Sequence, residues 1–144
     1  MNAHTGALHL VGSRLAAAIR PQPPVSFVDW LPGNIVLVDG AKKGDFWSAL
    51  DAPYLVEPAQ CLSVEHPSNL VTIRKGQQTG ASILALAWAL YLAEVAPDNI
   101  LYGVPGIDAL QDINGQKLQP MIDAWQKVTG KRIIFPPVSR SGAG

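Results

Sequence analysis

A long uncharged apolar run near the middle of the chain limits the possible folds more than any other feature. Residues 83–93 read ILALAWALYLA, and the apolar stretch extends from Ala81 to Ala96 before Pro97. The run is far shorter than the roughly 20 residues that a helix needs to cross a bilayer. It therefore predicts a helix buried inside a folded domain, with no membrane partner.

Composition fits one ordinary folded domain. Of 144 residues, 48% are hydrophobic and 15% are charged, which excludes a disordered chain. Eleven Lys and Arg balance eleven Asp and Glu, so the chain lacks the overall basic charge of a stand-alone nucleic-acid binder. The single cysteine, Cys61, and three scattered histidines speak against a disulfide scaffold and a zinc site. We expect the protein to reside in a reducing cytosol.

The first half of the chain predicts little regular structure. We expect residues 1–24 to be a weakly ordered leader with one short helix at 15–19. Residues 25–69 are cut repeatedly by proline and glycine, which predicts an irregular wrapping segment with only brief elements. Within it, Asn34 to Asp39 is a candidate strand and Asp45 to Leu50 a candidate helical turn.

Residues 70–144 alternate between β-type and α-type patterns. The β-branched runs predict strands at 70–74, 100–104 and 132–135. Helices are predicted at 81–96 and from Asp108 to about Val128, the latter broken near Asn114, Gly115 and Pro120 and stopped by Gly130. This order indicates βαβ units, a parallel sheet and an α/β fold class.

The loop between the first predicted strand and helix, KGQQTGAS at 75–82, has the composition of a phosphate site. In the pattern G-x-x-x-x-G-K-[ST], backbone N–H groups hold phosphates, the lysine reaches them, and the hydroxyl holds magnesium. Gly80 and Ser82 fit this register, but Lys75 replaces the first glycine and Ala81 the lysine. A lysine is long enough to fold back over the loop. The alternative is a polar turn with Gly80 as tight-turn residue and Ser82 as helix N-cap.

The residues around this loop resemble the large subunit of lambda-type tailed-bacteriophage terminases, whose packaging ATPase has such a displaced lysine. The resemblance covers roughly residues 23–126. It rests on short matches in family order: PVSFVDW at 24–30, Ala52-Pro53-Tyr54, TIRKGQQTGAS at 72–82, ILYGVPGIDAL at 100–110 and KLQPMI at 117–122.

The resemblance implies an incomplete P-loop NTPase sandwich from an ATP-driven motor that threads double-stranded viral DNA into capsids. It further implies a homo-oligomer in the cytoplasm of the bacterial host, with the small terminase subunit and the capsid portal as partners. An endonuclease domain would follow further along the chain. Two positions depart from the family: Ala81, and Gly106 where a threonine or similar residue is usual.

The resemblance also assigns roles to individual residues. Lys75 would be the catalytic cation on the β- and γ-phosphates of ATP, and Ser82 would ligate Mg²⁺. Tyr54 would lie near the adenine. The remaining loop residues would surround the phosphates: Gly76, Gln77, Gln78, Thr79, Gly80 and Ala81.

Hydrolysis also needs an acidic Walker B strand, and none is present in the sequence. The carboxylates after the loop fall on predicted helices and connections: Glu94, Asp98, Asp108, Asp112 and Asp123. We therefore interpret residues 70–144 as the N-terminal part of an ATPase domain truncated before Walker B, weakly active or inactive alone. The alternatives are another P-loop motor of helicase type and a non-catalytic interaction module or prophage remnant.

The four tryptophans, Trp30, Trp47, Trp88 and Trp125, stand at apolar positions. Single tryptophans in such positions usually pack in the core. We therefore expect them in the core rather than stacked on bases.

Overall fold

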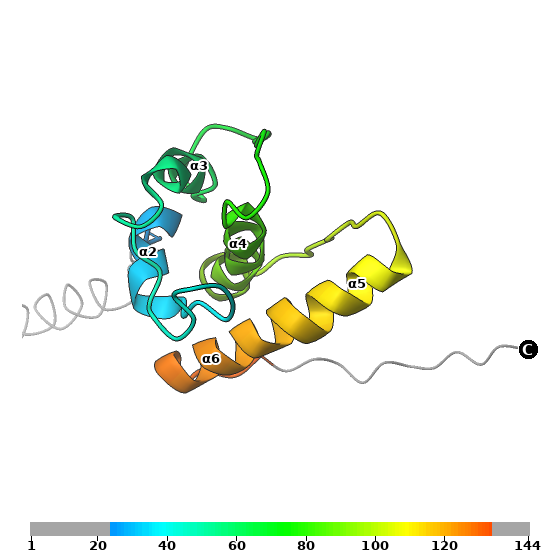
Figure 1. Ribbon diagram of the computed structural model, residues 1–144. Coiled ribbons are helices and arrows are strands. Elements are labelled where there is room, and N and C mark those ends of the chain that lie inside the picture. The colour runs from blue at the N-terminus through cyan, green and yellow to red at the C-terminus, as the bar shows by residue number, and fades with distance from the viewer. Residues whose placement is uncertain (1–23, 134–144) are drawn as a thin grey trace, which may run out of the picture.

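The computed structural model describes residues 24–133, and this part of the chain is helical (Figure 1). The predicted helix at 15–19 lies outside the described residues. The α-helices are α2 (Phe27–Asn34), α3 (Val56–Cys61), α4 (Ala81–Val95), α5 (Ile107–Ile113) and α6 (Gln119–Thr129). A 3-10 turn, η1 (Pro53–Leu55), precedes α3, and a π-helical turn, η2 (Asn114–Leu118), joins α5 to α6.

Helix α4 is the centre of the fold, as its uncharged sequence predicts. In Figure 1 it lies between α2 and α3 on one side and the α5–η2–α6 rod on the other. Its buried side chains cover most of the helix surface, and the small residues Ala85 and Ala89 on the remaining side are partly buried. A charged side chain before Glu94 would therefore be unfavourable. The buried residues of α4 are Ala81, Ile83, Leu84, Leu86, Ala87, Leu90 and Tyr91.

Aromatic side chains fasten α2 to α4. The ring centroid of Tyr91 lies 5.0 Å from that of Phe27 and 5.7 Å from that of Trp30. The Tyr91 hydroxyl donates to the Val25 carbonyl at 2.7 Å and accepts from the Val64 N–H at 3.4 Å. Burial raises the pKa of this hydroxyl above its ordinary value.

The tryptophans lie in or against the core, as predicted. Trp30, Trp47 and Trp125 are buried, and Trp88 packs against the core with its Nε1 donating to the Leu62 carbonyl at 2.8 Å. Their large apolar surfaces therefore contribute to stability.

The predicted long helix with a break is also confirmed. The break takes the form of the π turn η2, which ends at Leu118, with Gln119 between it and Pro120. A proline lacks the N–H that a regular helix would use, and a local change of helix type accommodates it. Gly130 ends α6 with a φ of 70°, a left-handed conformation that glycine adopts without strain.

The predicted strands at 70–74 and 100–104 are wrong for the described residues, where both segments are irregular and form no ladder. Leu70 is 80% and Leu101 97% exposed. A β-branched run becomes a strand only when a neighbouring strand satisfies its backbone groups. Within residues 24–133 neither segment has such a neighbour, so the α/β sandwich is not confirmed.

The other predicted elements of the β type and the predicted helical turn are also not found in the described residues. Between Asn34 and Asp39 the described chain forms one isolated antiparallel bridge, Val36 to Phe46, in place of a strand. Residues 45–50 contain the bridge residue Phe46 between a bend and a turn, and form no helical turn. Arg132 and Ile133 are irregular, and the rest of the predicted strand at 132–135 lies outside the described residues.

Candidate functional site

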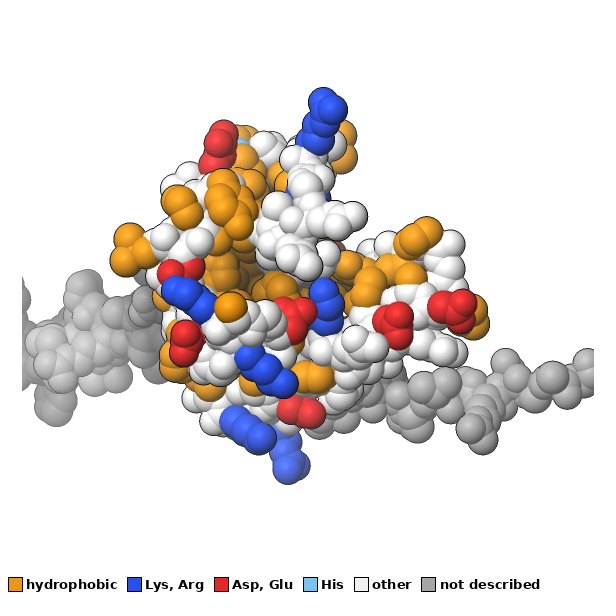
Figure 2. Space-filling model, viewed as in Figure 1, with side chains coloured by type: hydrophobic (Ala, Val, Ile, Leu, Met, Phe, Trp, Pro, Cys, Tyr) orange, Lys and Arg blue, Asp and Glu red, His pale blue; other side chains and the backbone are white. Residues whose placement is uncertain are grey.

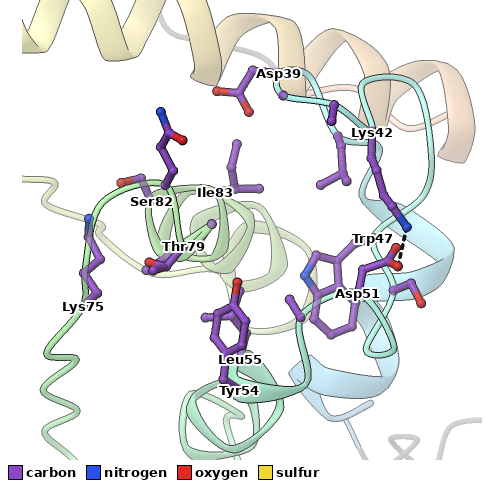
Figure 3. A pocket seen from close by; sticks show the side chains of 18 of the residues that line it. Asp39, Lys42, Trp47, Asp51, Tyr54, Leu55, Lys75, Thr79, Ser82 and Ile83 are labelled. Atoms are coloured by element: carbon purple, nitrogen blue, oxygen red, sulfur yellow. Dashed lines mark hydrogen bonds and ion pairs between the residues drawn. The ribbon is translucent and has the colours of Figure 1, made fainter.

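A cavity of about 670 Å³ opens at the N-terminal end of α4 (Figure 3). Three stretches of chain that are distant in sequence form its wall: the segment from 37 to 55, the loop and first turn at 75–83, and η2. The side chains that line the cavity include those of Asp39, Lys42, Trp47, Asp51, Tyr54, Leu55, Lys75, Gln78, Thr79, Ser82, Ile83 and Lys117.

Most of the residues predicted from sequence as a phosphate site meet at this cavity. Lys75, Tyr54 and Ser82 line it, together with Gln78, Thr79, Gly80 and Ala81. Gly76 lines an adjoining cavity of about 460 Å³ that shares Lys75, Thr79 and Tyr54. Gln77 lines neither cavity. The structure thus brings Lys75 and residues 78–82 together at one cavity and leaves Gly76 and Gln77 outside it.

The loop enters α4 through a left-handed turn. Gly80 is the N-cap, with a φ of 76°, and Gln78 also has a positive φ of 56°. A Cβ on Gly80 would lie 3.4 Å from Leu55 Cδ1. The tight-turn role predicted for Gly80 is therefore confirmed. The alternative role of Ser82 as N-cap is wrong, because Ser82 lies in the first turn of the helix.

The start of α4 has free hydrogen-bond donors. Gly80 supplies no side-chain cap, and the first helical hydrogen bond runs from the Leu84 N–H to the Gly80 carbonyl. The N–H groups of Ala81, Ser82 and Ile83 therefore have no partner within the helix. Together with the helix dipole, such groups attract anions. The first turn of α4 is suited to hold a phosphate.

A polar atom beside this turn also lacks a partner. Thr79 Oγ1 is buried and forms no hydrogen bond within the described residues. An unmade hydrogen bond at a buried hydroxyl is unfavourable, and such atoms often mark a place where a ligand or water binds. The Thr79 hydroxyl is therefore a second group that suits a polar ligand.

The charges of the cavity are partly neutralised. Lys42 forms an ion pair with Asp51, and Lys117 Nζ lies 3.4 Å from Asp39 Oδ2. Lys75 has no carboxylate within ion-pair distance among the described residues. One lysine at the loop end of the cavity thus remains available to an anion.

The opposite side of the cavity holds the ring of Trp47 beside the Lys42–Asp51 ion pair. In Figure 3, Lys75 and Ser82 lie on one side while Trp47 and Asp51 lie on the other, with Tyr54 and Leu55 between them. Figure 2 shows a hollow near the middle of the visible face, with apolar side chains at the bottom and both signs of charge around it. The cavity therefore suits a ligand that carries an anionic group at one end and a flat apolar group at the other.

The protein itself supplies little for a metal ion. Ser82 is one candidate hydroxyl ligand, and residues 24–133 contain no group of three or more His, Cys, Asp or Glu that could hold a metal. Mg²⁺ commonly keeps several waters and binds through one or two protein groups plus the phosphates of its substrate. These residues fit a Mg²⁺ ion that arrives with a nucleotide rather than a resident one.

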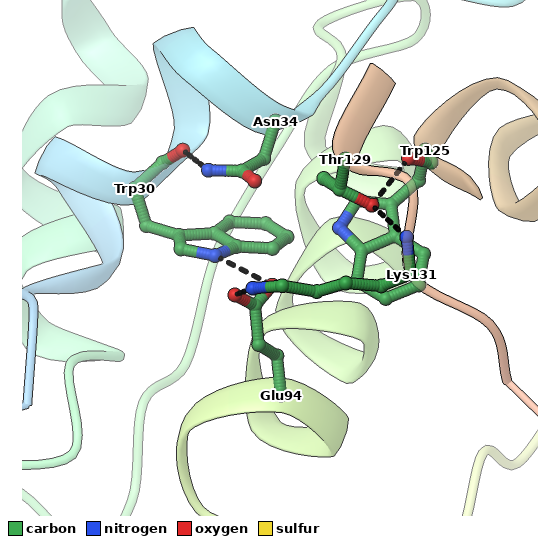
Figure 4. Close-up of polar contacts among 6 residues, drawn as sticks. All are labelled: Trp30, Asn34, Glu94, Trp125, Thr129 and Lys131. Carbon is green, nitrogen blue, oxygen red and sulfur yellow. Dashed lines mark hydrogen bonds and ion pairs between the residues drawn. The ribbon is translucent and has the colours of Figure 1, made fainter. Parts of the chain in front are cut away.

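A second polar cluster is structural (Figure 4). Trp30 Nε1 donates to Glu94 Oε2 at 3.1 Å, and Lys131 pairs with the other oxygen of Glu94. Thr129 Oγ1 donates to the Trp125 carbonyl at 2.8 Å and accepts from the Lys131 N–H at 3.2 Å. These contacts tie the end of α6 to α4 and α2.

Sequence reasoning missed several residues of the cavity. Trp47 was expected only as a core residue, and nothing in the local pattern singles out Asp39, Lys42 or Asp51. Lys117 belongs to the KLQPMI match, which gave its place in the family order but no role. Only the tertiary fold brings these side chains to the loop.

Comparison with known protein families gives a match over the loop and most of the cavity. The family model described as phage terminase large subunit gpA, ATPase domain, matches residues 40–134, about two thirds of the chain. Neither the curated proteins nor the solved structures yield a significant match. In the part of the chain that the structure describes, no helix is long and apolar enough to span a membrane.

Proposed function

Since the chain belongs to the phage terminase large subunit gpA family and is matched over its ATPase domain, we propose that the cavity at the start of α4 binds ATP. The observation that carries the proposal is the meeting of an unpaired lysine, Lys75, with the uncapped first turn of a long helix in one cavity. A cation and free amides in this arrangement are what a triphosphate needs.

The proposed roles follow from position. The Lys75 ammonium contacts the β- and γ-phosphates, and the amides of Ala81 and Ser82 hold them from the helix end. The Thr79 hydroxyl, which is buried without a partner, donates to a phosphate oxygen. Ser82 supplies its hydroxyl to Mg²⁺. Tyr54 lies between Lys75 and Trp47 (Figure 3), where its ring would contact the adenine.

The other loop residues are proposed to act through the backbone. Gln78, in its left-handed conformation, and Gly80 shape the turn. Ala81 takes the position where a P-loop usually has lysine, and its backbone amide faces the phosphates. Gly76 and Gln77 lie outside the main cavity. We expect them to contact the phosphates only if the loop closes over the nucleotide.

In the full-length protein, ATP hydrolysis would drive the packaging of double-stranded viral DNA into capsids. The proposed partners are the small terminase subunit, the capsid portal and further copies of the same chain in the cytoplasm of the bacterial host. A nuclease domain would cut the genome. At this cavity the two carboxylates, Asp39 and Asp51, are paired with lysines. We therefore expect the 144-residue chain to bind ATP but to hydrolyse it slowly.

Calorimetric titration with ATP and Mg²⁺ tests the proposal. Lys75→Ala should weaken binding at least about tenfold, because a charge-assisted hydrogen bond contributes about 1.5–3 kcal/mol. Lys43→Ala is the matched control, since Lys43 is exposed on a nearby loop, does not line the cavity and carries the same charge. Equal affinity of both variants, or no saturable binding by the unmodified chain, would overturn the proposal.

A further inference from the structure

A second lysine reaches the proposed phosphate site from another part of the chain. Lys117 lies in the π turn η2 and lines the same cavity as Lys75 and Ser82. Its Nζ lies 3.4 Å from Asp39 Oδ2, and both side chains are partly solvated, 35% and 47% exposed. At this distance and exposure an ion pair is weak. The ion pair with Asp39 therefore positions Lys117 but is weak enough for Lys117 to change partners.

Charge matching favours an exchange of partners when a triphosphate enters. The cavity is lined by three lysines and two aspartates, and the two ion pairs leave only the charge of Lys75 free. A nucleotide triphosphate with its Mg²⁺ carries about two negative charges, more than one lysine neutralises. A cation is attracted more strongly to the larger charge at the same distance.

Of the two paired lysines, Lys117 is the better placed to change partners. In Figure 3 the Lys42–Asp51 pair lies beside Trp47, on the far side of the cavity from Lys75 and Ser82. Asp39 lies nearer the top of the view, on the side of the cavity toward the rod that carries η2.

The π turn places Lys117 between an anchored and an unanchored helix. Met121, Ile122 and Trp125 of α6 are buried, whereas α5 has no buried residue. Ile107, at the start of α5, is 71% exposed. π turns often occur at functional sites because the extra residue per turn redirects a side chain. Leu118 within η2 and the neighbouring Ile113 pack partly against the core. The flexible side chain of Lys117, rather than a shift of η2, therefore brings its ammonium to a new partner.

We propose that Lys117 is a second triphosphate-binding residue, which Asp39 holds in the absence of nucleotide and which exchanges this carboxylate for a phosphate when ATP binds. The inference rests on the proposed ATP site. It adds that the site responds to its occupancy, because Lys117 contacts Asp39 in one state and the nucleotide in the other.

A double-mutant cycle in the 144-residue chain tests the exchange, with ATP–Mg²⁺ and adenosine as probes. Lys117→Met should weaken ATP binding about threefold, the order of a partly solvated ion pair. Asp39→Asn should tighten it, because the competing carboxylate is gone. Added to Asp39→Asn, Lys117→Met should weaken binding about tenfold, because Lys117 then has no partner to lose. Adenosine binding should not change.

Control variants distinguish the loss of the Lys117 charge from a structural effect of the substitution. Lys117→Arg should retain ATP affinity, and Lys127→Met, a matched change on exposed α6 surface outside this cavity, should have no effect. If Lys117→Met weakens binding equally with and without Asp39→Asn, or not at all, the exchange is overturned. If Lys75→Ala still weakens binding, the proposed ATP site stands. Absence of ATP binding by the unmodified chain would overturn both.

Discussion

The left-handed turn at Gly80 allows a prediction whose magnitude follows from the structure. With a φ of 76°, any residue other than glycine is strained there, by about 1–2 kcal/mol. Replacing glycine by alanine also lowers the conformational entropy of the unfolded chain, which offsets about 0.4–1 kcal/mol of this strain. The added Cβ would lie 3.4 Å from Cδ1 of buried Leu55, a close but tolerable contact. Gly80→Ala should therefore destabilise the chain by about 1 kcal/mol.

Gly130 provides a matched comparison. Its φ of 70° is similar, but a Cβ there would meet nothing within 4 Å, and the residue ends α6 outside the cavity. Gly130→Ala should have a similar effect on stability and none on ATP binding. Gly80→Ala should also weaken ATP binding, because it disturbs the turn that directs the first amides of α4. Gly80→Asn should destabilise less than Gly80→Ala, since asparagine adopts left-handed conformations more readily.

Urea unfolding followed by tryptophan fluorescence, together with ATP titration, measures both effects. The expected order of stability is unmodified chain, Gly80→Asn and Gly80→Ala, and a loss of about 1 kcal/mol corresponds to roughly 4 °C in Tm. If Gly80→Ala is as stable as the unmodified chain, the left-handed turn is refuted. If it loses stability but binds ATP normally, the first turn of α4 does not hold the phosphates.

Two further predictions concern buried hydroxyls. Burial raises the pKa of Tyr91, so the stability that this residue contributes is complete below about pH 10 and falls as pH rises through the higher pKa of the folded state. Tyr91→Phe should lose about 1–2 kcal/mol of stability at pH 7, because the Val64 N–H and the Val25 carbonyl lose their partner. Between pH 9 and 11, about one unit either side of the ordinary tyrosine pKa, the urea midpoint of this variant should fall less than that of the unmodified chain. An equal fall in both proteins would contradict this. Thr79→Val removes a buried hydroxyl that has no partner, so thermal unfolding without nucleotide should show equal or slightly higher stability while ATP binding weakens severalfold; a clear loss of stability would show that the hydroxyl already has a partner.

Helix α4 and the broken helix of α5 and α6 follow from local sequence. Helices α2 and α3 lie in the segment for which only brief elements are predicted, and the predicted strands do not form in the described residues. Helix α4 is predictable because its apolar run has no charge, and the irregular turn before Pro120 because proline cannot continue a regular helix. The run at 70–74 has the side chains of a strand, but a strand also needs a partner, and side-chain composition does not specify one. Leu70 accordingly stays exposed.

The candidate site likewise contains residues that the sequence predicts and residues that only the tertiary fold brings in. Lys75, Gly80 and Ser82 are predictable together because the spacing of a phosphate loop lies within one short segment. Asp39 and Lys117 come from distant segments, and no spacing rule links them to the loop. The alternative interpretation of the loop places the N-cap at Ser82, because serine is a common cap. The left-handed turn gives that position to Gly80.

Backbone amide NMR of the 144-residue chain tests the central claim most directly. The account places the triphosphate at the first turn of α4, so ATP with Mg²⁺ should shift the amide resonances of Gly80, Ala81 and Ser82 strongly. Adenosine, which has no phosphate, should leave these three nearly unchanged, and Lys75→Ala should demand far more ATP for the same shifts. If ATP leaves the amides of Gly80 to Ser82 unmoved while shifting others, the triphosphate lies elsewhere and the account is wrong.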